Sequence, residues 1–564
     1  MHFLRSFFLS IGFALGAVSL DVHAAGPWGD QGDGTYKNPI LPSDYSDPDV
    51  IRVDNDYYMV SSTFQLSPGV VVLHSRDLVN WETIGYAIPD MLVCGPKYRW
   101  DRMENYKQGI YAPSIRYHDH QFWVFVNSHG GEGFFVCTAK NPAGPWTATL
   151  MVDKNNKPLL ADTWSDVCPL WDDDGKAYLA AAERGQGLIL FQMRPDGRQL
   201  LDADVTISSG MGGTRIWHYV GSEGNKLYKW NGYYYLFNVD FQGKGPLGPG
   251  CGAYWKRSKN LYGTKADGTS GGPGDPGSYE LRTLGRSVPI QGGFVDTPAG
   301  QEYYIAQFST MDVAGRHPCL LPVTWVNGWP IPGSHPEDGN NKAVMAWSGT
   351  NPVKGMPVLF PQGSDEFDGA TLNPQWQWNH QPRPGFWSLT ERPGFLRLKA
   401  FKPIEPENFF KAGNTICQRY FKSDSVQADI KVDLSHMADG EEAGLAHFDG
   451  GKDYATIGVV QKGGGQSLIF NNNGTVTSGP AVTGTMIYFR TKVDAQNEAT
   501  FFYSPDGENF TQLGNAYPLK SANYRGDDIG IYNYNNLADA GYIDVDWFHY
   551  VFSGTASGQQ PKGP

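Results

Sequence analysis

Three acidic residues, Asp47, Asp166 and Glu223, precede an aromatic motif that recurs along the chain, each at a distance of 11 or 12 residues. Two carboxyl groups that face each other across a pocket can cleave a glycosidic bond. One protonates the leaving oxygen, and the other, ionised, activates water or attacks carbon. A third carboxylate beside the acid raises the pKa of that acid by like-charge repulsion. The three residues therefore have the chemistry of glycoside cleavage if the fold brings them together.

The aromatic motif is a turn-like polar cluster that runs into an aromatic pair and a strand-like apolar run. Its five copies occupy residues 54–60, 120–124, 174–179, 231–236 and 300–305, and the third keeps only the second aromatic. The spacing of 55 to 69 residues suits one small antiparallel sheet per copy and predicts a five-bladed β-propeller. Because the inner strands of a propeller surround a central channel, the acids of blades one, three and four are expected at one mouth of it.

Taken singly, each acid has a plainer interpretation. Asp47 could form a turn, Asp166 precedes an acidic turn, and Glu223 could be a solvated surface residue. The second and fifth blades carry Tyr111 and Gly292, which lies beside Gln291, at the corresponding places. The shared offset is the reason to treat the three acids as one set.

The composition excludes several partners. The 564-residue chain has a formal net charge of -13 and no cluster of Lys and Arg, so neither nucleic acid nor an anionic membrane surface is an expected partner. Aromatic residues make up 14% of the chain, with 69 glycines and 38 prolines, which is typical of a turn-rich all-β protein. Some of these rings could stack on sugars, although most could equally belong to the core.

Residues 1–24 have the three-part layout of a secretory signal peptide, with cleavage expected after Ala24. The alternative is an uncleaved anchor, but the apolar stretch of residues 7–20 is short for a membrane span. No other segment could cross a bilayer. Because of the signal peptide, the protein is expected to be exported to the periplasm or outside the cell. The six dispersed cysteines could form disulfides there or remain buried thiols.

The chain divides into two all-β regions. We predict a propeller over residues 26–350, a two-sheet β-sandwich over 359–553 and a disordered tail over 554–564. The glycine- and proline-rich residues 243–278 are predicted to form one long loop at the rim of the site.

Several motifs resemble glycoside hydrolase family 43. They are Asn38-Pro39-Ile40-Leu41, Tyr45-Ser46-Asp47-Pro48-Asp49-Val50, Ser61-Ser62-Thr63-Phe64, Tyr111-Ala112-Pro113 and Asp166-Val167-Cys168-Pro169-Leu170-Trp171. Phe367-Asp368-Gly369 and the tryptophan-rich residues 372–378 are similar to the concanavalin-like sandwich of the β-xylosidase-like members. The resemblance covers essentially all of the chain after the signal peptide.

The resemblance assigns roles to the acids. Asp47 matches the family's general base, Glu223 its general acid, and Asp166 the carboxylate that tunes and orients this acid. The family inverts the anomeric centre, so Asp47 and Glu223 should stand roughly 6.5 to 9.5 Å apart to admit a water.

Further positions match pocket and metal residues of the family. Arg316, Phe64 and Tyr111 match positions near the sugar, with surface exposure or core packing as the alternative. Gln291, a further predicted substrate contact, stands where many members have a histidine, often over a calcium ion. In the sandwich, Asp546 and Asp365-Glu366 resemble a calcium site, or they are plain surface acids. The chemistry itself requires no cofactor.

We therefore expect a secreted, inverting exo-glycosidase that releases terminal β-D-xylose or α-L-arabinofuranose from oligosaccharides of the hemicellulose or arabinan type. The alternatives are an endo-acting, arabinanase-like hydrolase and a non-catalytic carbohydrate-binding propeller. The sequence leaves the oligomeric state undetermined.

Overall fold

The structure is a computed structural model. It describes residues 28–130, 133–160, 164–183, 187–207, 212–218, 222–240, 252–285, 289–307, 311–333 and 343–553. The predicted signal peptide (1–24) and the predicted tail (554–564) lie outside the described residues. In the part of the chain that is described, no helix is long and apolar enough to span a membrane.

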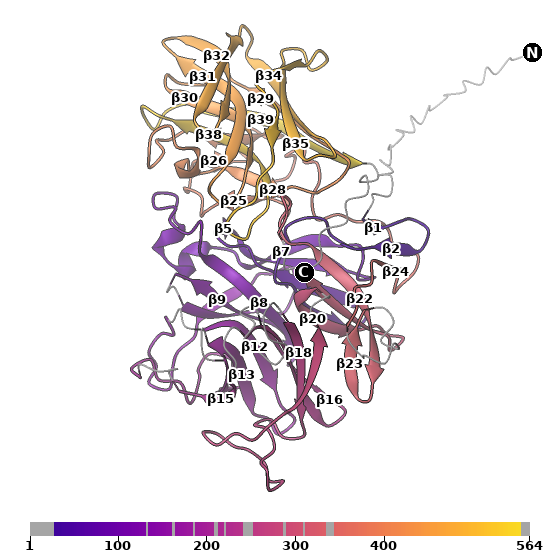
Figure 1. Cartoon of the computed structure of the whole chain (residues 1–564). Coiled ribbons are helices and arrows are strands. Elements are labelled where there is room, and N and C mark those ends of the chain that lie inside the picture. Colours follow the sequence, from indigo (N-terminus) through magenta and orange to yellow (C-terminus); the bar gives the residue numbers. More distant parts are fainter. Residues whose placement is uncertain are drawn as a thin grey trace, which may run out of the picture.

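Five four-stranded antiparallel sheets form the first region (Figure 1). The first sheet contains β3 (Asp49–Val53), β4 (Asp56–Ser61), β6 (Gly69–Ser75) and β7 (Glu82–Ile88), and the second contains β8 (Gly109–His118), β9 (Gln121–His129), β10 (Gly133–Ala139) and β11 (Thr147–Leu150). The third contains β12 (Trp164–Trp171), β13 (Ala177–Glu183), β14 (Gly187–Met193) and β15 (Thr214–Trp217), and the fourth contains β16 (Ser222–Trp230), β17 (Tyr233–Asp240), β18 (Gly252–Ser258) and β19 (Glu280–Gly285). The fifth contains β20 (Ile290–Asp296), β21 (Glu302–Gln307), β22 (Pro318–Val326) and β23 (Trp329–Pro332).

The first strands of these sheets contact one another in a ring. β3 contacts β8, β8 contacts β12, β12 contacts β16, β16 contacts β20, and β20 returns to β3. This is the arrangement of a propeller with its inner strands around a central channel, and it confirms the predicted all-β fold. The recurring aromatic motif leads into the second strand of each sheet, β4, β9, β13, β17 and β21.

Strand β9 shows why the second strands are nearly continuous apolar runs. Phe122, Val124 and Val126 pack in a core cluster shared with the first blade, whereas Trp123 and Phe125 pack in a cluster shared with the third. Successive side chains of a strand point to opposite faces, and both faces of this blade are covered by a neighbour. The sequence therefore has no polar alternation here.

Two large sheets form the second region, at the top of Figure 1. One contains β25 (Gln377–Asn379), β28 (Ile416–Arg419), β30 (Glu441–Phe448), β31 (Tyr454–Lys462), β32 (Gly465–Asn472), β33 (Thr475–Ala481) and β38 (Asp528–Asn535). The other contains β26 (Trp387–Ser388), β27 (Leu396–Lys399), β29 (Ser425–Asp433), β34 (Met486–Val493), β35 (Glu498–Ser504), β36 (Thr511–Gln512), β37 (Tyr517–Pro518) and β39 (Tyr542–Ser553). A single apolar cluster that includes Ile430, Leu445 and Phe548 draws on both sheets, as the predicted sandwich requires.

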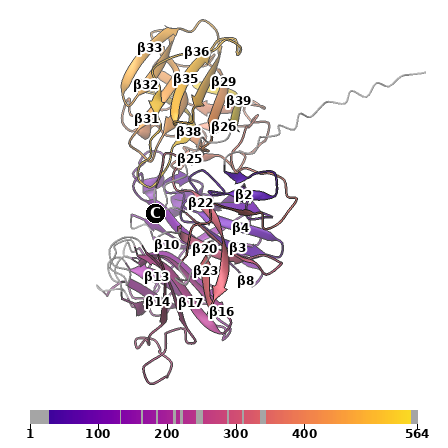
Figure 2. The same cartoon turned by 45° about the vertical axis from the view of Figure 1, so that its right-hand side comes forward.

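The sandwich and the propeller share a sheet. Strand β5 (Leu66–Ser67) belongs to a propeller loop, yet it pairs with β25 of the sandwich through Ser67 opposite Trp378. Both views place the sandwich directly against one end of the propeller (Figure 2). The second region is therefore joined to the first by backbone hydrogen bonds as well as by side chains.

The remaining short elements connect these parts. Strands β1 (Gly29–Asp30), β2 (Thr35–Lys37) and β24 (Ser348–Thr350) form a small sheet that ties together the two ends of the propeller chain. The 3-10 helices in the described residues are η1 (Met91–Cys94), η2 (Pro96–Tyr98) and η3 (Phe409–Lys411).

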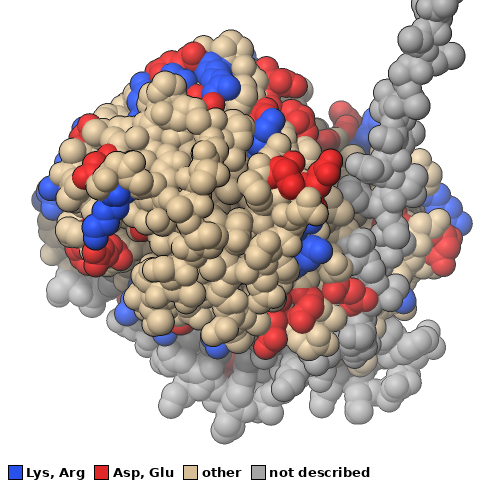
Figure 3. Space-filling model, turned by 90° about the horizontal axis from the view of Figure 1, so that it is seen from above, with Lys and Arg blue, Asp and Glu red and all other residues tan. Residues whose placement is uncertain are grey.

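One sequence expectation changes at this level. The predicted long loop 243–278 is wrong as one loop, because strand β18 lies inside it and separates residues 259–278 from residues 243–251, which lie outside the described residues. Five cysteines, all except Cys251, are described; all five are buried, and they form no disulfides with one another. Figure 3 shows the sandwich from above, and among the described residues drawn there Lys and Arg are interspersed with Asp and Glu.

Candidate active site

A pocket of about 620 Å³ opens at the end of the propeller where the inner strands begin. It is lined by Asp47, Tyr111, Asp166, Glu223, Gln291 and Arg316, and on the sandwich side by Tyr524. All three predicted acids and three of the four predicted substrate contacts thus lie in one cavity. Its volume falls within the range of small-molecule sites.

Each inner strand enters the pocket through a residue with a left-handed backbone. The residues are Asp47 (φ 52), Ala112 (φ 43), Asp166 (φ 51), Gly224 (φ 64) and Gln291 (φ 54). In the four strands that follow blade one, this residue lies at an irregularity in the pairing with the second strand. A left-handed residue costs about 1 to 2 kcal/mol unless it is glycine or, in part, Asp or Asn. The repeated distortion turns adjacent side chains toward the same cavity, which Ser165 and Asp166 both line.

This register corrects the predicted equivalence of Asp166 and Glu223. Ser165 pairs with Ala182 and Glu223 pairs with Val239, so Glu223 corresponds to Ser165 and precedes the left-handed position by one residue. The hairpins between first and second strands differ in length, and counting back from the aromatic motif therefore reaches two neighbouring positions. Both line the pocket, so the offset still identified the site.

Asp47 is held by four hydrogen bonds. Ser62 Oγ donates to Asp47 Oδ2 at 2.6 Å, and Arg316 Nη2 lies 3.0 Å from the same oxygen. Gln307 Nε2 donates to Asp47 Oδ1 at 2.9 Å, while Gln307 Oε1 accepts the Asp47 backbone N–H at 2.5 Å. An ionised carboxylate only accepts hydrogen bonds, so three converging donors suit a charged Asp47 in one fixed orientation.

Asp166 and Glu223 are linked through Gln291. The Gln291 Nε2 amide lies 3.3 Å from Asp166 Oδ2 and 3.4 Å from Glu223 Oε2. The Gly224 N–H also donates to Asp166 Oδ2, at 2.5 Å. Burial raises the pKa of the Asp166 carboxyl, the Gly224 hydrogen bond opposes this, and the negative charge of Asp47 adds to it. The two carboxyl groups therefore share one donor, with Asp166 buried and Glu223 half-buried.

Phe64 does not line the pocket, contrary to the predicted substrate contact. It is buried, and its ring meets that of Tyr111 edge to face, with centroids 5.0 Å apart. The hydroxyl of Tyr111 donates to Lys107 O at 3.0 Å. Phe64 thus supports Tyr111 from behind the pocket wall, so the alternative of core packing holds for Phe64.

The sandwich supplies Tyr524 through a tight turn. Asn523 and Tyr524 both have positive φ, and Ala522 and Arg525 exchange backbone hydrogen bonds across them. Tyr524 is 59% exposed, its ring lies 6.3 Å from that of Tyr111, and the Arg316 guanidinium lies 5.5 Å from its centroid. An aromatic from the second region therefore forms part of the pocket wall.

Two segments of the sandwich hold the loop that carries Arg316. Asp527 N donates to Val313 O at 2.7 Å, and Lys422 Nζ pairs with Asp312 Oδ2 at 2.7 Å. His317 and Lys422 together hold the pKa of Asp312 below its ordinary value, although its burial acts in the opposite direction. The position of Arg316 thus depends on the sandwich.

The residues that the sequence reasoning missed are Ser62, Gln307 and Tyr524. Ser62 lies inside a motif that resembles the family, but nothing in that motif separates it from its neighbours. Gln307 ends β21 after the fifth aromatic copy, and Tyr524 lies more than 200 residues beyond Arg316. Only the folded arrangement brings these side chains to Asp47 and Arg316.

The structure gives no support to calcium at Asp546. Lys431 Nζ lies 2.6 Å from Asp546 Oδ2. Asp365 accepts hydrogen bonds from Phe367 N and Trp376 Nε1, and Glu366 pairs with His549. Within the described ranges no three His, Cys, Asp or Glu side chains cluster as metal ligands. The carboxylates of Asp546, Asp365 and Glu366 therefore do not form a calcium site, because calcium takes six to eight oxygen ligands.

Comparison with known proteins supports the family resemblance. Residues 36–330 match the family model described as Glycosyl hydrolases family 43, and residues 364–551 match the Beta xylosidase C-terminal Concanavalin A-like domain. A beta-xylosidase of Formosa agariphila is 33% identical, over 95% of this chain and 93% of that protein. A non-reducing end alpha-L-arabinofuranosidase of Bacteroides ovatus is 28% identical, over 92% of this chain and 94% of that protein.

Among solved structures, the bifunctional GH43-CE protein of Bacteroides eggerthii superposes with a TM-score of 0.75 at 26% identity. The alignment covers 92% of this chain and 64% of that chain. The similarity thus extends over both the propeller and the sandwich.

Proposed function

Because the chain belongs to glycosyl hydrolase family 43, we propose that this glycoside hydrolase is an exported, inverting exo-glycosidase. It releases terminal β-D-xylose or α-L-arabinofuranose from oligosaccharides of the hemicellulose or arabinan type. The proposal is carried by one observation, the convergence of Asp47, Asp166 and Glu223 in a pocket that Tyr524 of the sandwich helps to enclose. The beta-xylosidase and arabinofuranosidase relatives support the choice of pentose.

The proposed chemistry divides between two acids. Glu223 protonates the leaving oxygen, and Asp47 removes a proton from the attacking water. Water attacks the face opposite the leaving group, so the anomeric configuration inverts. The donors around Asp47 favour its role as a charged base, and the position of Glu223 beside Asp166 favours its role as the protonated partner.

Exo action is supported by the pocket wall that the sandwich supplies. Tyr524, held by its tight turn, stands over Arg316 and beside Tyr111. A wall of this kind restricts the space for a chain that continues in both directions, which an endo-acting enzyme requires. A terminal sugar therefore suits the pocket better than an internal one.

Product analysis tests this proposal. With linear xylo- and arabino-oligosaccharides, we expect monosaccharide as the only early product, and proton NMR should first detect the anomer of inverted configuration. Shorter oligosaccharides as early products would establish the endo-acting alternative, and the retained anomer would exclude Asp47 as a base for water. Failure to turn over any nitrophenyl pentoside or oligosaccharide would favour a carbohydrate-binding propeller.

The pH dependence of catalysis should change in Asp166→Asn. Ionised Asp166 disfavours the ionised form of Glu223, because the two carboxyl groups share the Gln291 amide. Removal of this charge lets Glu223 lose its proton at lower pH. We expect the alkaline limb of the kcat/KM profile to move to lower pH by about one unit, which corresponds to ~1.4 kcal/mol.

The raised pKa of Asp166 sets the range of this effect. Below that pKa Asp166 is neutral and exerts no repulsion, so the variant should differ from the wild type mainly on the alkaline side. Asp174→Asn, an exposed turn carboxylate of the same blade, is the control and should leave the profile unchanged. An unmoved alkaline limb in Asp166→Asn would mean that Asp166 acts only in binding.

A further inference from the structure

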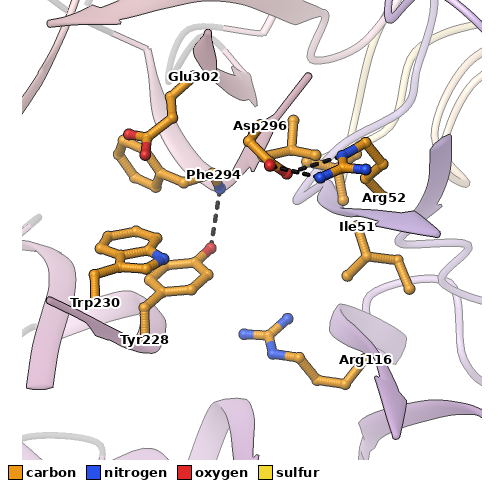
Figure 4. Close-up of a pocket in the computed structure, with 10 residues that line it drawn as sticks. Ile51, Arg52, Arg116, Tyr228, Trp230, Phe294, Asp296 and Glu302 are labelled. Carbon is orange, nitrogen blue, oxygen red and sulfur yellow. Dashed lines mark hydrogen bonds and ion pairs between the residues drawn. The ribbon is translucent and has the colours of Figure 1, made fainter. Parts of the chain in front are cut away.

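A second pocket, of about 410 Å³, lies at the opposite end of the propeller (Figure 4). Its wall comes from inner strands β3, β8, β16 and β20, toward the ends of these strands, and from Glu302 at the start of β21. In β16, Glu223 is the second residue and lines the active-site pocket, whereas Trp230 is the last residue and lines this one. No described residue lines both cavities.

A buried ion pair lies between the two ends of the channel. Arg116 Nη1 is 2.8 Å from Asp49 Oδ2, and Arg116 Nη2 donates to Cys168 Sγ at 2.8 Å. Asp49 is fully buried. Side chains from blades one, two and three therefore fill the channel behind the second pocket, which makes it a separate site and not an extension of the active site.

One wall of this pocket is aromatic. The rings of Tyr228 and Trp230 are stacked, with centroids 4.4 Å apart and an interplanar angle of 9°. The Tyr228 hydroxyl accepts the Phe294 N–H at 2.9 Å, which fixes the orientation of the stack. Figure 4 shows this stack on the side of the cavity that faces Arg116. A rigid, half-buried aromatic wall offers an apolar surface at low entropic cost.

Both guanidinium groups of the pocket are already paired with carboxylates. Arg52 pairs with Asp296 through two contacts, of 2.6 and 3.0 Å, and Arg116 pairs with Asp49. Glu302 Oε2 accepts the Trp325 indole N–H at 2.6 Å. Because both guanidinium groups already face carboxylates, an anionic ligand would have to displace an existing pair. A neutral ligand rich in hydroxyl groups can instead bond to the edges of these pairs.

We propose that this pocket is a second saccharide-binding site that holds a stretch of pentose polymer against Trp230, with hydroxyl groups bonded to Glu302 and to the Arg52–Asp296 pair. The choice of a pentose polymer rests on the proposed function, whereas the choice of a neutral saccharide rests on the pocket. Such a site would retain the enzyme on its polymer while the opposite mouth removes terminal sugars.

Native affinity electrophoresis of the full chain tests this proposal, with soluble arabinoxylan in one gel series and linear arabinan in another. We expect retardation in at least one polymer, and we expect Trp230→Ala to weaken the apparent affinity about five- to tenfold, the loss of one stacked aromatic. The kcat/KM of Trp230→Ala for a nitrophenyl pentoside should be unchanged, because Trp230 is remote from Glu223.

Trp171→Ala is the matched control. Trp171 is the last residue of inner strand β12, as Trp230 is of β16, but it does not line the pocket. Since Trp230→Ala also removes packing, Ile51→Phe provides a second variant that narrows the cavity and leaves the stack intact. It should weaken retardation to a similar extent.

The proposal is overturned if the wild type is not retarded in either polymer. It is also overturned if Trp230→Ala and Ile51→Phe, both folded by circular dichroism, are retarded like Trp171→Ala. Retardation that survives in a chain without activity on any pentoside would contradict the proposed function but leave this site standing.

Discussion

Replacement of Glu223 by glutamine is expected to lower kcat on xylo- and arabino-oligosaccharides by about 10² to 10⁴-fold, the usual contribution of a general acid. Glutamine has nearly the same shape and retains polar contact with Gln291, so the pocket is preserved. It has no acidic proton to give to the leaving oxygen. Steady-state kinetics on oligosaccharides with chromatographic detection of the released sugar would measure the loss.

The leaving group separates this role from a structural one. A dinitrophenolate departs without protonation, so the loss in Glu223→Gln should be much smaller on a dinitrophenyl pentoside than on an oligosaccharide. Glu280→Gln is the control, because Glu280 is an exposed acid of the same blade, paired with Arg257. Equal losses on both substrates would mean that Glu223 does not act as the acid.

The sequence predicted the architecture well because propeller blades repeat. Each aromatic copy leads into a second strand that is covered on both faces, and this requirement acts on residues close together in the chain. The same local regularity located Asp47, Asp166 and Glu223. Counting back from the aromatic motif reached Glu223, which lies one residue before the position equivalent to Asp166. The count differs because the hairpin between the first and second strands varies in length from blade to blade.

The parts of the site that the sequence did not reveal depend on long-range contacts. Gln307 reaches Asp47 across the junction of blades five and one, and Tyr524 arrives from a turn of the sandwich. Neither residue has a local pattern that distinguishes it from other polar or aromatic residues. Their roles follow from how the sheets close and dock, which no short motif encodes.

Phe64 and Asp546 show the same limit for single residues. A phenylalanine next to a pocket motif can face the ligand or support the wall, and the edge contact with Tyr111 decides for support. An acid such as Asp546, inside strand β39, can ligate a metal or pair with a cation, and its carboxylate pairs with Lys431. In both cases the neighbour that decides is distant in sequence.

Replacement of Asp47 is expected to be as damaging as replacement of Glu223. Asp47 has a left-handed backbone, which asparagine tolerates at least as well as aspartate, so Asp47→Asn removes the base without added strain. We expect kcat to fall about 10² to 10⁴-fold because the attacking water keeps its proton. Asp54→Asn is the matched control, since Asp54 has φ 55 in an exposed hairpin of the same blade.

Added azide should then restore turnover, because azide attacks without giving up a proton. Asp47→Gly is the better variant for this measurement, since glycine accepts the positive φ and leaves room for the anion beside Ser62 and Arg316. We expect a glycosyl azide of inverted configuration, identified by NMR, in Asp47→Gly and none in the wild type. A rescued product of retained configuration would place the missing carboxylate on the other face of the sugar and contradict the assignment of Asp47 as the base.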